Sequence, residues 1–290
     1  MTAFFFDTNS ELLWTKAKEL NLTNIIKMPY TVCGIEYFYD LGESYDAKWF
    51  FDLVRQGNMP ITSALNPEDY KTYFEPFFKN GEDIFYLSFS AEMSATFKYM
   101  DLAVEELSKT YPNVKFIRYD SKAISMAAGL QVYAAAKAFN EGKSIDEIIE
   151  LLNELAPRVN AYIVVDDLQH LKRGGRLSGA QAFIAGILKI KPIVKLVVNG
   201  TLAVKEKVPG LNKALLSIAT ETITKVKDLD KYPIVVLDAD AKNEGDRLLN
   251  MLKEALPNAE IWRQSVGPVI GAHCGPGTVA IVFVGSERPV

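Results

Sequence analysis

The sequence is poor in the residues that anchor disulfides and imidazole chemistry, with two cysteines and two histidines among 290 residues. Cys33 and Cys274 are too few for a disulfide framework, and the sequence holds no Cys/His cluster with metal-ligand spacing. No apolar run approaches the roughly twenty residues that a membrane span needs. The segment from Met1 to Asp7 lacks the basic and the long apolar parts of a signal peptide. We therefore expect a reducing, cytoplasmic location.

A surplus of positive charge is absent as well. The formal net charge is −4 and the basic residues are scattered, which does not support nucleic-acid binding. Hydrophobic residues make up 49% of the chain and charged residues 23%, a composition typical of globular proteins. A chain of this length has room for two α/β domains, each with its own core. We predict an N-terminal domain over residues 1–160 and a C-terminal domain over residues 161–290.

In the first half, short apolar runs with strand character end in polar residues. These ends are Asp7, Ser88 and Asp120, and each is followed by a helical pattern. Alternation of strands and helices predicts a largely parallel N-terminal sheet with helices on both faces. The ligand crevice of such sheets lies beyond the carboxyl ends of the strands, so these residues should converge. The alternative is that they only cap the helices that follow.

The second half mixes connection types. A strand over residues 161–165 precedes an apolar helix over residues 180–188, and Asn199-Gly200 is typical of a β-hairpin. A last strand is predicted from Thr278 to Val284. Hairpin and crossover connections together indicate an α+β C-terminal domain, and so an α/β protein of two domains.

His273 lies in a segment rich in glycine and proline, V-G-P-V-I-G-A-H-C-G-P-G, which precedes the last strand. This pattern predicts a rigid, irregular loop whose backbone can approach an anion closely. The alternative is a tight turn in which His273 bonds a neighbouring carbonyl. The adjacent Cys274 suggests a Cys-His nucleophile, but sequence neighbours seldom point at each other, and a small buried cysteine is the preferred interpretation.

Two hydroxyl residues are further candidates. Thr62 lies between Pro60 and Pro67 in a segment that we predict to be a loop, and Ser94 lies in the polar stretch after the strand over residues 84–87. With His273, they could hold a carboxylate by hydrogen bonds. No Walker loop, H-E-x-x-H or G-x-S-x-G motif is found, and no acid/base pair has a recognisable spacing. The sequence therefore favours a binding protein over an enzyme, without a metal or cofactor.

A basic segment, Lys172-Arg173-Gly174-Gly175-Arg176, is predicted to be a compact cationic loop. It could bind a phosphate or an acidic partner surface. The alternative is a solvated basic turn.

These motifs occur in an order that resembles the DegV family of bacterial fatty-acid-binding proteins, and the resemblance spans essentially the whole chain. Its most specific parts are L-x-x-L-x-x-G-G-R over residues 168–176 and H-C-G-P-G over residues 273–277. The resemblance implies two α/β domains and one buried long-chain fatty acid. It also implies that Thr62, Ser94 and His273 bind the ligand carboxylate.

Members of the carrier type hand the fatty acid to a separate kinase, which phosphorylates it to an acyl phosphate for phospholipid synthesis. On this resemblance, Arg173 and Arg176 face the partner or the phosphate. The apolar helices over residues 125–140 and 180–188 are candidate walls for the acyl chain, although core packing explains them equally.

The sequence departs from the family pattern near Ser94. Ala91 and Ala95 stand where glycines are common, and Glu92 adds a negative charge. Ala64-Leu65 replaces the usual Gln-Pro after Thr62-Ser63. These changes could alter ligand choice.

Two other functions stay open at this point. His273 could bond covalently to a small carbonyl substrate, as in the substrate domains of dihydroxyacetone kinases. The chain could also be a ligand-sensing protein whose partner binds residues 172–176.

Overall fold

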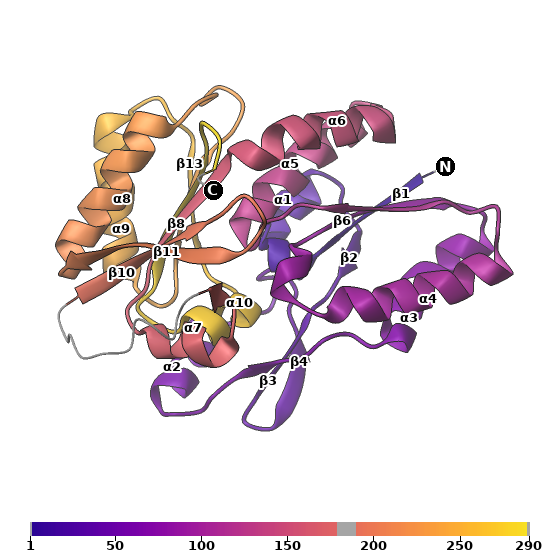
Figure 1. The fold of residues 1–290 in the computed structure, drawn as a ribbon, viewed down its shortest axis with the longest axis horizontal. Helices are drawn as coiled ribbons and strands as arrows, with labels where there is room; N and C mark the ends of the chain where they lie inside the picture. Colours follow the sequence, from indigo (N-terminus) through magenta and orange to yellow (C-terminus); the bar gives the residue numbers. More distant parts are fainter. Residues whose placement is uncertain (1, 179–189, 289–290) are drawn as a thin grey trace. The chain divides into compact units, whose positions relative to one another are not determined.

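The computed structural model describes residues 2–178 and 190–288, which form two compact units (Figure 1). The first unit comprises Met1–Tyr45 and Ile61–Glu154, and the second comprises Asp46–Pro60 and Leu155–Val290. The segment Asp46–Pro60 thus folds with the second unit although its flanks belong to the first. The predicted helix over residues 180–188 lies outside the described residues. In the part that is described, no helix has the length and apolar character needed to span a membrane.

The first unit is built on a parallel sheet of four strands, in the order β2-β1-β6-β7. The strands are β1 (Thr2–Asp7), β2 (Asn24–Ile26), β6 (Asp83–Ser88) and β7 (Phe116–Asp120). Its helices are α1 (Trp14–Glu19), α3 (Pro67–Lys79), α4 (Thr96–Thr110), α5 (Met126–Asn140) and α6 (Ile145–Leu155), with short 3₁₀ turns η1 (Thr8–Ser10) and η2 (Ala91–Met93). The largely parallel N-terminal sheet predicted from the sequence is confirmed.

Aromatic side chains of β1 show that helices cover both faces of this sheet. Successive residues of a strand point to opposite faces. The Phe4 ring packs on Phe139 of α5 with centroids 5.6 Å apart, whereas the Phe5 ring packs edge-on against Phe74 of α3 at 5.4 Å. Helix α5 therefore covers one face and α3 the other.

The strand ends of this sheet converge as predicted, and their polar side chains organise the loops there. Asp7 is fully buried and accepts hydrogen bonds from the Tyr86 hydroxyl (2.9 Å) and from the backbone N–H of Phe89 (3.0 Å). Burial raises the pKa of Asp7 to about 7, against the lowering effect of these hydrogen bonds. Asp120 accepts from the backbone N–H of Ala91 (3.3 Å). The carboxylates thus fix the backbone of the loop that leads to Ser94.

A small antiparallel sheet, β4-β3-β5, completes the first unit. It consists of β3 (Pro29–Val32), β4 (Ile35–Phe38) and β5 (Ile61–Thr62). Cys33 and Gly34 form the turn between β3 and β4, with φ of 53° and 76°. The prediction of a loop from Pro60 to Pro67 was wrong at its start, because Thr31 pairs with Ile61 and Tyr30 pairs with Thr62. Proline limits strand pairing, but here the prolines lie outside the two paired residues.

The second unit contains a mixed sheet of seven strands, in the order β13-β12-β14-β8-β10-β11-β9. The strands are β8 (Val159–Val164), β9 (Leu177–Ser178), β10 (Ile190–Leu196), β11 (Leu202–Pro209), β12 (Ile234–Asp238), β13 (Ile261–Ser265) and β14 (Val279–Val284). The helices of its described residues are α2 (Ala47–Arg55), α7 (Leu168–Gly174), α8 (Leu211–Lys225), α9 (Lys242–Ala255) and α10 (Pro268–Cys274), together with the 3₁₀ turn η3 (Ala156–Arg158). The β10–β11 hairpin around Asn199-Gly200 is confirmed, as is the mixed character of this half.

Helices α8 and α9 cover one face of this mixed sheet (Figure 1). Leu215 and Ile218 of α8 and Leu248 of α9 are buried against Tyr162 of β8 and Val236 of β12. Burial of such side chains is the main stabilising term, on the order of 1.5 to 3 kcal/mol for each large apolar residue.

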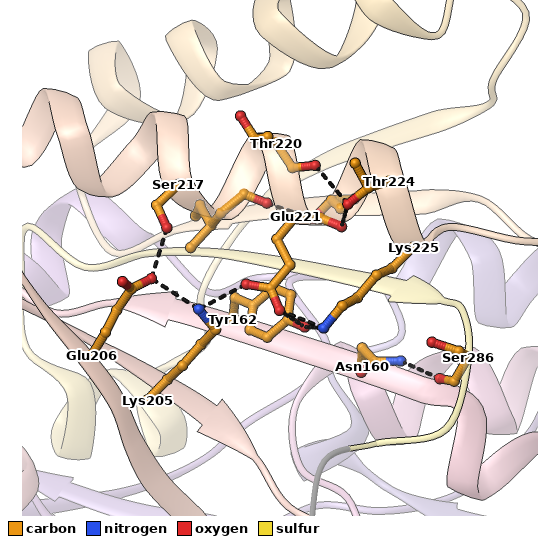
Figure 2. A network of polar contacts seen from close by, with 12 residues as sticks. Asn160, Tyr162, Lys205, Glu206, Ser217, Thr220, Glu221, Thr224, Lys225 and Ser286 are labelled. Carbon is orange, nitrogen blue, oxygen red and sulfur yellow. Dashed lines mark hydrogen bonds and ion pairs between the residues drawn. The ribbon is translucent and has the colours of Figure 1, made fainter.

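A half-buried polar network ties α8 to the sheet (Figure 2). Glu221 of α8 accepts hydrogen bonds from the Tyr162 hydroxyl (2.8 Å) and from Lys225 (2.6 Å), and it forms an ion pair with Lys205 of β11 (2.8 Å). Lys205 also pairs with Glu206 at 2.9 Å. The charges of the two acids and the two lysines cancel, so the network carries no net charge. Its role is to link α8 to the sheet.

Helix α2 is held on α10 by close packing. A Cβ atom added to Gly271 would lie 2.9 Å from Cζ of Phe51 and 3.1 Å from Cε1 of Phe50. Arg55, at the end of α2, forms an ion pair with Asp240. These contacts explain why the segment Asp46–Pro60 belongs to the second unit.

Candidate functional site

Thr62 is held on the small sheet of the first unit. It lies at the end of β5, opposite Tyr30 of β3, and its side chain is half-buried. Its neighbour Ile61 points to the other face of the sheet and is 66% exposed. The strand therefore directs the Thr62 hydroxyl to the face that also carries Tyr30.

Ser94 directly follows the 3₁₀ turn η2 in an extended conformation. Its half-buried hydroxyl accepts a hydrogen bond from the backbone N–H of Thr96 at 3.2 Å. That bond uses a lone pair of the oxygen, so the O–H group can still donate to an anion.

Thr96 links the two candidate segments of the first unit. Its buried Oγ1 accepts from the backbone N–H of Leu65 (3.2 Å) and shares a hydrogen bond with the Tyr70 hydroxyl (2.8 Å). Leu65 lies three residues after Thr62, and Thr96 lies two residues after Ser94. The structure thus brings these two predicted residues into neighbouring segments.

The departures from the family pattern near Ser94 do not strain the backbone. Ala95 has φ −78° and ψ −1°, which any residue can adopt, and Ala91 lies in the first turn of η2. Glu92 is exposed, and its backbone N–H donates to the hydroxyl of Ser90 at 3.3 Å. Glycine is therefore not required at positions 91 and 95 of this chain.

His273 lies in a helix rather than in the predicted irregular loop, which is a correction to the sequence-based expectation. Helix α10 begins with Pro268 at its first position and ends before Gly275, whose φ is 71°. Proline suits the first turn of a helix and glycine suits a positive φ after its end. The same residues that suggested a loop are thus the boundaries of a two-turn helix.

The basic segment is also helical in part. Lys172 and Arg173 form the last turn of α7, and Gly175 follows the helix with φ 65°. Arg176 comes next and donates a hydrogen bond to the carbonyl oxygen of Gly174. The three basic side chains are exposed, so the prediction of a cationic segment is confirmed, whereas the prediction of a loop is wrong before Gly175.

Helices α7 and α10 pack directly against each other (Figure 1). The imidazole of His273 lies on Gly174, where an added Cβ atom would be 2.2 Å from Nδ1. The two motifs with the most specific resemblance therefore form one structural element of the second unit.

The surroundings of His273 favour its neutral form. Burial lowers its pKa to about 4, and the positive charge of Arg176 contributes in the same direction. His170, the other histidine, also has a lowered pKa, because of burial and then of Arg173. A neutral imidazole can donate one N–H to a carboxylate at pH 7.

Cys274 is buried, and its carbonyl oxygen accepts a hydrogen bond from the Thr278 hydroxyl at 2.9 Å. This agrees with the packing interpretation of that cysteine. Within the described ranges, His, Cys, Asp and Glu side chains form no group of three that could hold a metal ion.

The candidate residues belong to both units. Thr62 and Ser94 are in the first unit, and His273, Arg173 and Arg176 are in the second. The sequence did not single out His170, although its position in α7, four residues before Gly174, places it one turn from the His273 contact.

Comparison with known proteins gives matches over nearly the whole chain. A DegV domain-containing protein of Clostridium perfringens is 33% identical over 284 residues, which cover 98% of this chain and 97% of that protein. Two solved structures are similar at comparable coverage. A fatty acid binding DegV family protein from Streptococcus agalactiae has 26% identity and a TM-score of 0.84, with 99% of each chain covered.

DegV, a fatty acid binding protein from Bacillus subtilis, has 27% identity and a TM-score of 0.81, with 98% of this chain and 99% of that chain covered. Both solved relatives are described as binding proteins, in line with the expectation of a binding protein rather than an enzyme. The sequence profile described as "Uncharacterised protein, DegV family" matches residues 6–286. This protein belongs to the DegV family.

Proposed function

We propose that this protein binds a single long-chain fatty acid and presents its carboxylate to a partner kinase, which phosphorylates it to an acyl phosphate. The observation that carries the proposal is similarity along nearly the whole chain to two proteins that are described as fatty-acid-binding, at 26% and 27% identity. The candidate residues supply the hydrogen-bond donors that a carboxylate needs.

In the proposed complex, Thr62, Ser94 and His273 bind the carboxylate. Each side chain is half-buried and can donate a hydrogen bond, and bonds to a charged acceptor are stronger than bonds between neutral groups. The acyl chain supplies most of the affinity, because each buried CH₂ group contributes about 0.8 kcal/mol. No cofactor is required for this function.

The kinase step is supported by the position of the arginines. Arg173 and Arg176 are exposed near His273, and guanidinium groups are well suited to pair with phosphate or with acidic side chains. We assign them to the partner-facing or phosphate-facing side. The ATP chemistry then belongs to the partner, and the carrier acts in the cytoplasm to supply phospholipid synthesis.

The proposal is tested with His273→Ala and Ser94→Ala. Both variants should bind fatty acid much more weakly than the wild type while keeping its circular dichroism spectrum and melting temperature. Unchanged affinity in both would contradict the head-group assignment.

For the kinase step, the loaded protein is mixed with ATP and a candidate kinase, and hydroxylamine traps the acyl phosphate. We expect a hydroxamate to form with the wild type. It should be lost in Arg173→Ala and Arg176→Ala, although both variants should bind fatty acid normally.

A further inference from the structure

Helices α7 and α10 hold each other through two imidazoles and two glycines. His273 of α10 lies on Gly174 of α7, where an added Cβ atom would be 2.2 Å from the imidazole Nδ1. His170 of α7 lies on Gly275, just after α10, where an added Cβ atom would be 2.3 Å from the imidazole Cδ2. Each helix thus places a ring on the glycine of the other.

Both distances are far below 3.0 Å, and real Cβ atoms essentially never lie closer than that to another heavy atom. Each imidazole therefore occupies the volume that a side chain would fill on the opposite helix. Because protein interiors are close-packed, a ring seated in this way has little freedom to change its rotamer.

The two neighbouring glycines of the basic segment differ in what requires them. Gly174 lies in the last turn of α7 and is not among the residues with positive φ, so its backbone would accept alanine. Gly175 has φ 65°, and an added Cβ atom would meet nothing within 4 Å. The contact with His273 requires glycine at position 174, whereas the backbone conformation requires it at position 175.

We propose that Gly174 and His170 are positioning residues, which set the place and orientation of the His273 imidazole for binding a carboxylate. The inference rests on the proposed function in assigning the carboxylate to His273. Gly174 positions this ring directly, because only a residue without a side chain leaves room for it. His170 acts on the other end of the same contact by fixing the chain at Gly275, two residues after His273.

Gly174 also connects His273 with Arg176. The guanidinium of Arg176 donates to the carbonyl oxygen of Gly174, and its charge contributes to lowering the pKa of His273. Gly174 therefore contacts both the imidazole of His273 and the guanidinium of Arg176. A side chain at position 174 would displace the imidazole of His273.

The first test compares Gly174→Ala with Gly175→Ala, with cis-parinaric acid as a fluorescent long-chain fatty acid. The Gly174→Ala variant should bind at least about tenfold more weakly than the wild type. The matched control, Gly175→Ala, should stay within about twofold, since its added methyl group meets open space, although its backbone strain lowers stability. Equal weakening of both variants, or no effect of Gly174→Ala, would overturn the proposal.

The second readout is the pKa of the His273 imidazole. This pKa would not change if Gly174 only contributed to the stability of the fold and did not position the ring. The chain has two histidines, so two imidazole resonances are expected and His170→Gln assigns them. In Gly174→Ala, displacement of the ring towards water should raise the pKa of His273 from about 4 towards its ordinary value of 6.5. A pKa that stays near 4 would contradict the positioning role.

The role of His170 is tested with Ala and Phe at position 170. His170→Ala removes the ring from Gly275 and should weaken fatty-acid binding, whereas His170→Phe keeps a flat ring and should restore most of the affinity. If His170→Phe were as weak as His170→Ala, the imidazole would act by its chemistry and the steric argument would fail. Failure of the proposed function is separate, because then the wild type binds no fatty acid while the His273 titration still reports on Gly174.

Discussion

The hydroxyl of Thr96 accepts a hydrogen bond from the backbone N–H of Leu65 at 3.2 Å. This bond joins the segment that carries Thr62 to the segment that carries Ser94, although the two are about thirty residues apart in the sequence. The two hydroxyl groups assigned to the ligand head group therefore do not depend on separate flexible loops. Their common anchor is Thr96, which is itself buried.

Removal of the Thr62 hydroxyl should weaken fatty-acid binding. Thr62→Val keeps the shape of the side chain and removes one donor to a charged acceptor, which should cost about 1.5 to 3 kcal/mol of binding free energy. Isothermal titration with a soluble long-chain fatty acid measures the change. Ser63→Ala is the matched control. Ser63 is the next residue in the chain and its side chain is exposed, so this substitution should leave the affinity unchanged. Equal affinity for Thr62→Val and the wild type would remove Thr62 from the site.

Thr96→Val should act on both segments at once. It leaves the Tyr70 hydroxyl and the Leu65 N–H without their present partner, and each buried polar group left unsatisfied costs about 1 to 3 kcal/mol. We expect a lower melting temperature, weaker fatty-acid binding and faster amide exchange around residues 62–66. Thr110→Val at the end of α4, where the side chain is exposed, serves as the control. Normal exchange at residues 62–66 would show that Thr96 does not anchor them.

Much of the fold can be predicted from the sequence, because apolar strands alternate with helical patterns and end in polar residues. Asp7 and Asp120 were correctly expected at converging strand ends, and the Asn199-Gly200 hairpin follows from local turn chemistry. Helix α10 could not be recognised in the same way. Gly271 lies inside it because Phe50 and Phe51 pack there, and such a tertiary requirement overrides helix propensity.

The same limit applies to the site. The chemistry of Thr62, Ser94 and His273 is evident from residue types, but the contact of His273 with Gly174 joins residues about a hundred positions apart in the sequence. Spacing in the sequence carries no information on such a pair. For the same reason β5 was missed, since its two residues become a strand only by pairing with Tyr30 and Thr31.

Acid should destabilise the protein in part through His273. Its pKa is about 4 in the folded state and 6.5 in the unfolded state, so the folded state binds fewer protons between these values. The free energy of unfolding should therefore fall as the pH is lowered from about 6.5 towards 4, and His273→Gln should lose this part of the dependence. Urea unfolding at several pH values measures it. Asp7, whose pKa is raised to about 7, has the opposite effect, but it cancels in the comparison of the two proteins.

If the two proteins lost stability in parallel on acidification, burial of a neutral His273 would be contradicted. A variant at His170 provides a second comparison, because the pKa of His170 is also lowered. Its effect should add to that of His273→Gln if the two imidazoles titrate independently.

The network around Glu221 should contribute to stability rather than to binding. Glu221→Gln leaves Lys205 and Lys225 without their shared carboxylate, and we expect a loss of about 1 to 3 kcal/mol in the free energy of unfolding. Glu206→Gln, at the more exposed end of the network, should cost less than about 1 kcal/mol. Urea unfolding distinguishes the two variants, and both should bind fatty acid normally. A stronger effect of Glu206→Gln would reverse this assignment.

The most direct test of the central claim is mass spectrometry of the purified protein, first under native conditions and then after denaturation. We predict one fatty acid per chain under native conditions, either co-purified or taken up on addition, which is released intact on denaturation and identified by its mass. A protein that binds no fatty acid, or that instead carries a polar adduct on His273 after denaturation, would contradict the carrier function and favour an enzyme that acts on a small carbonyl substrate.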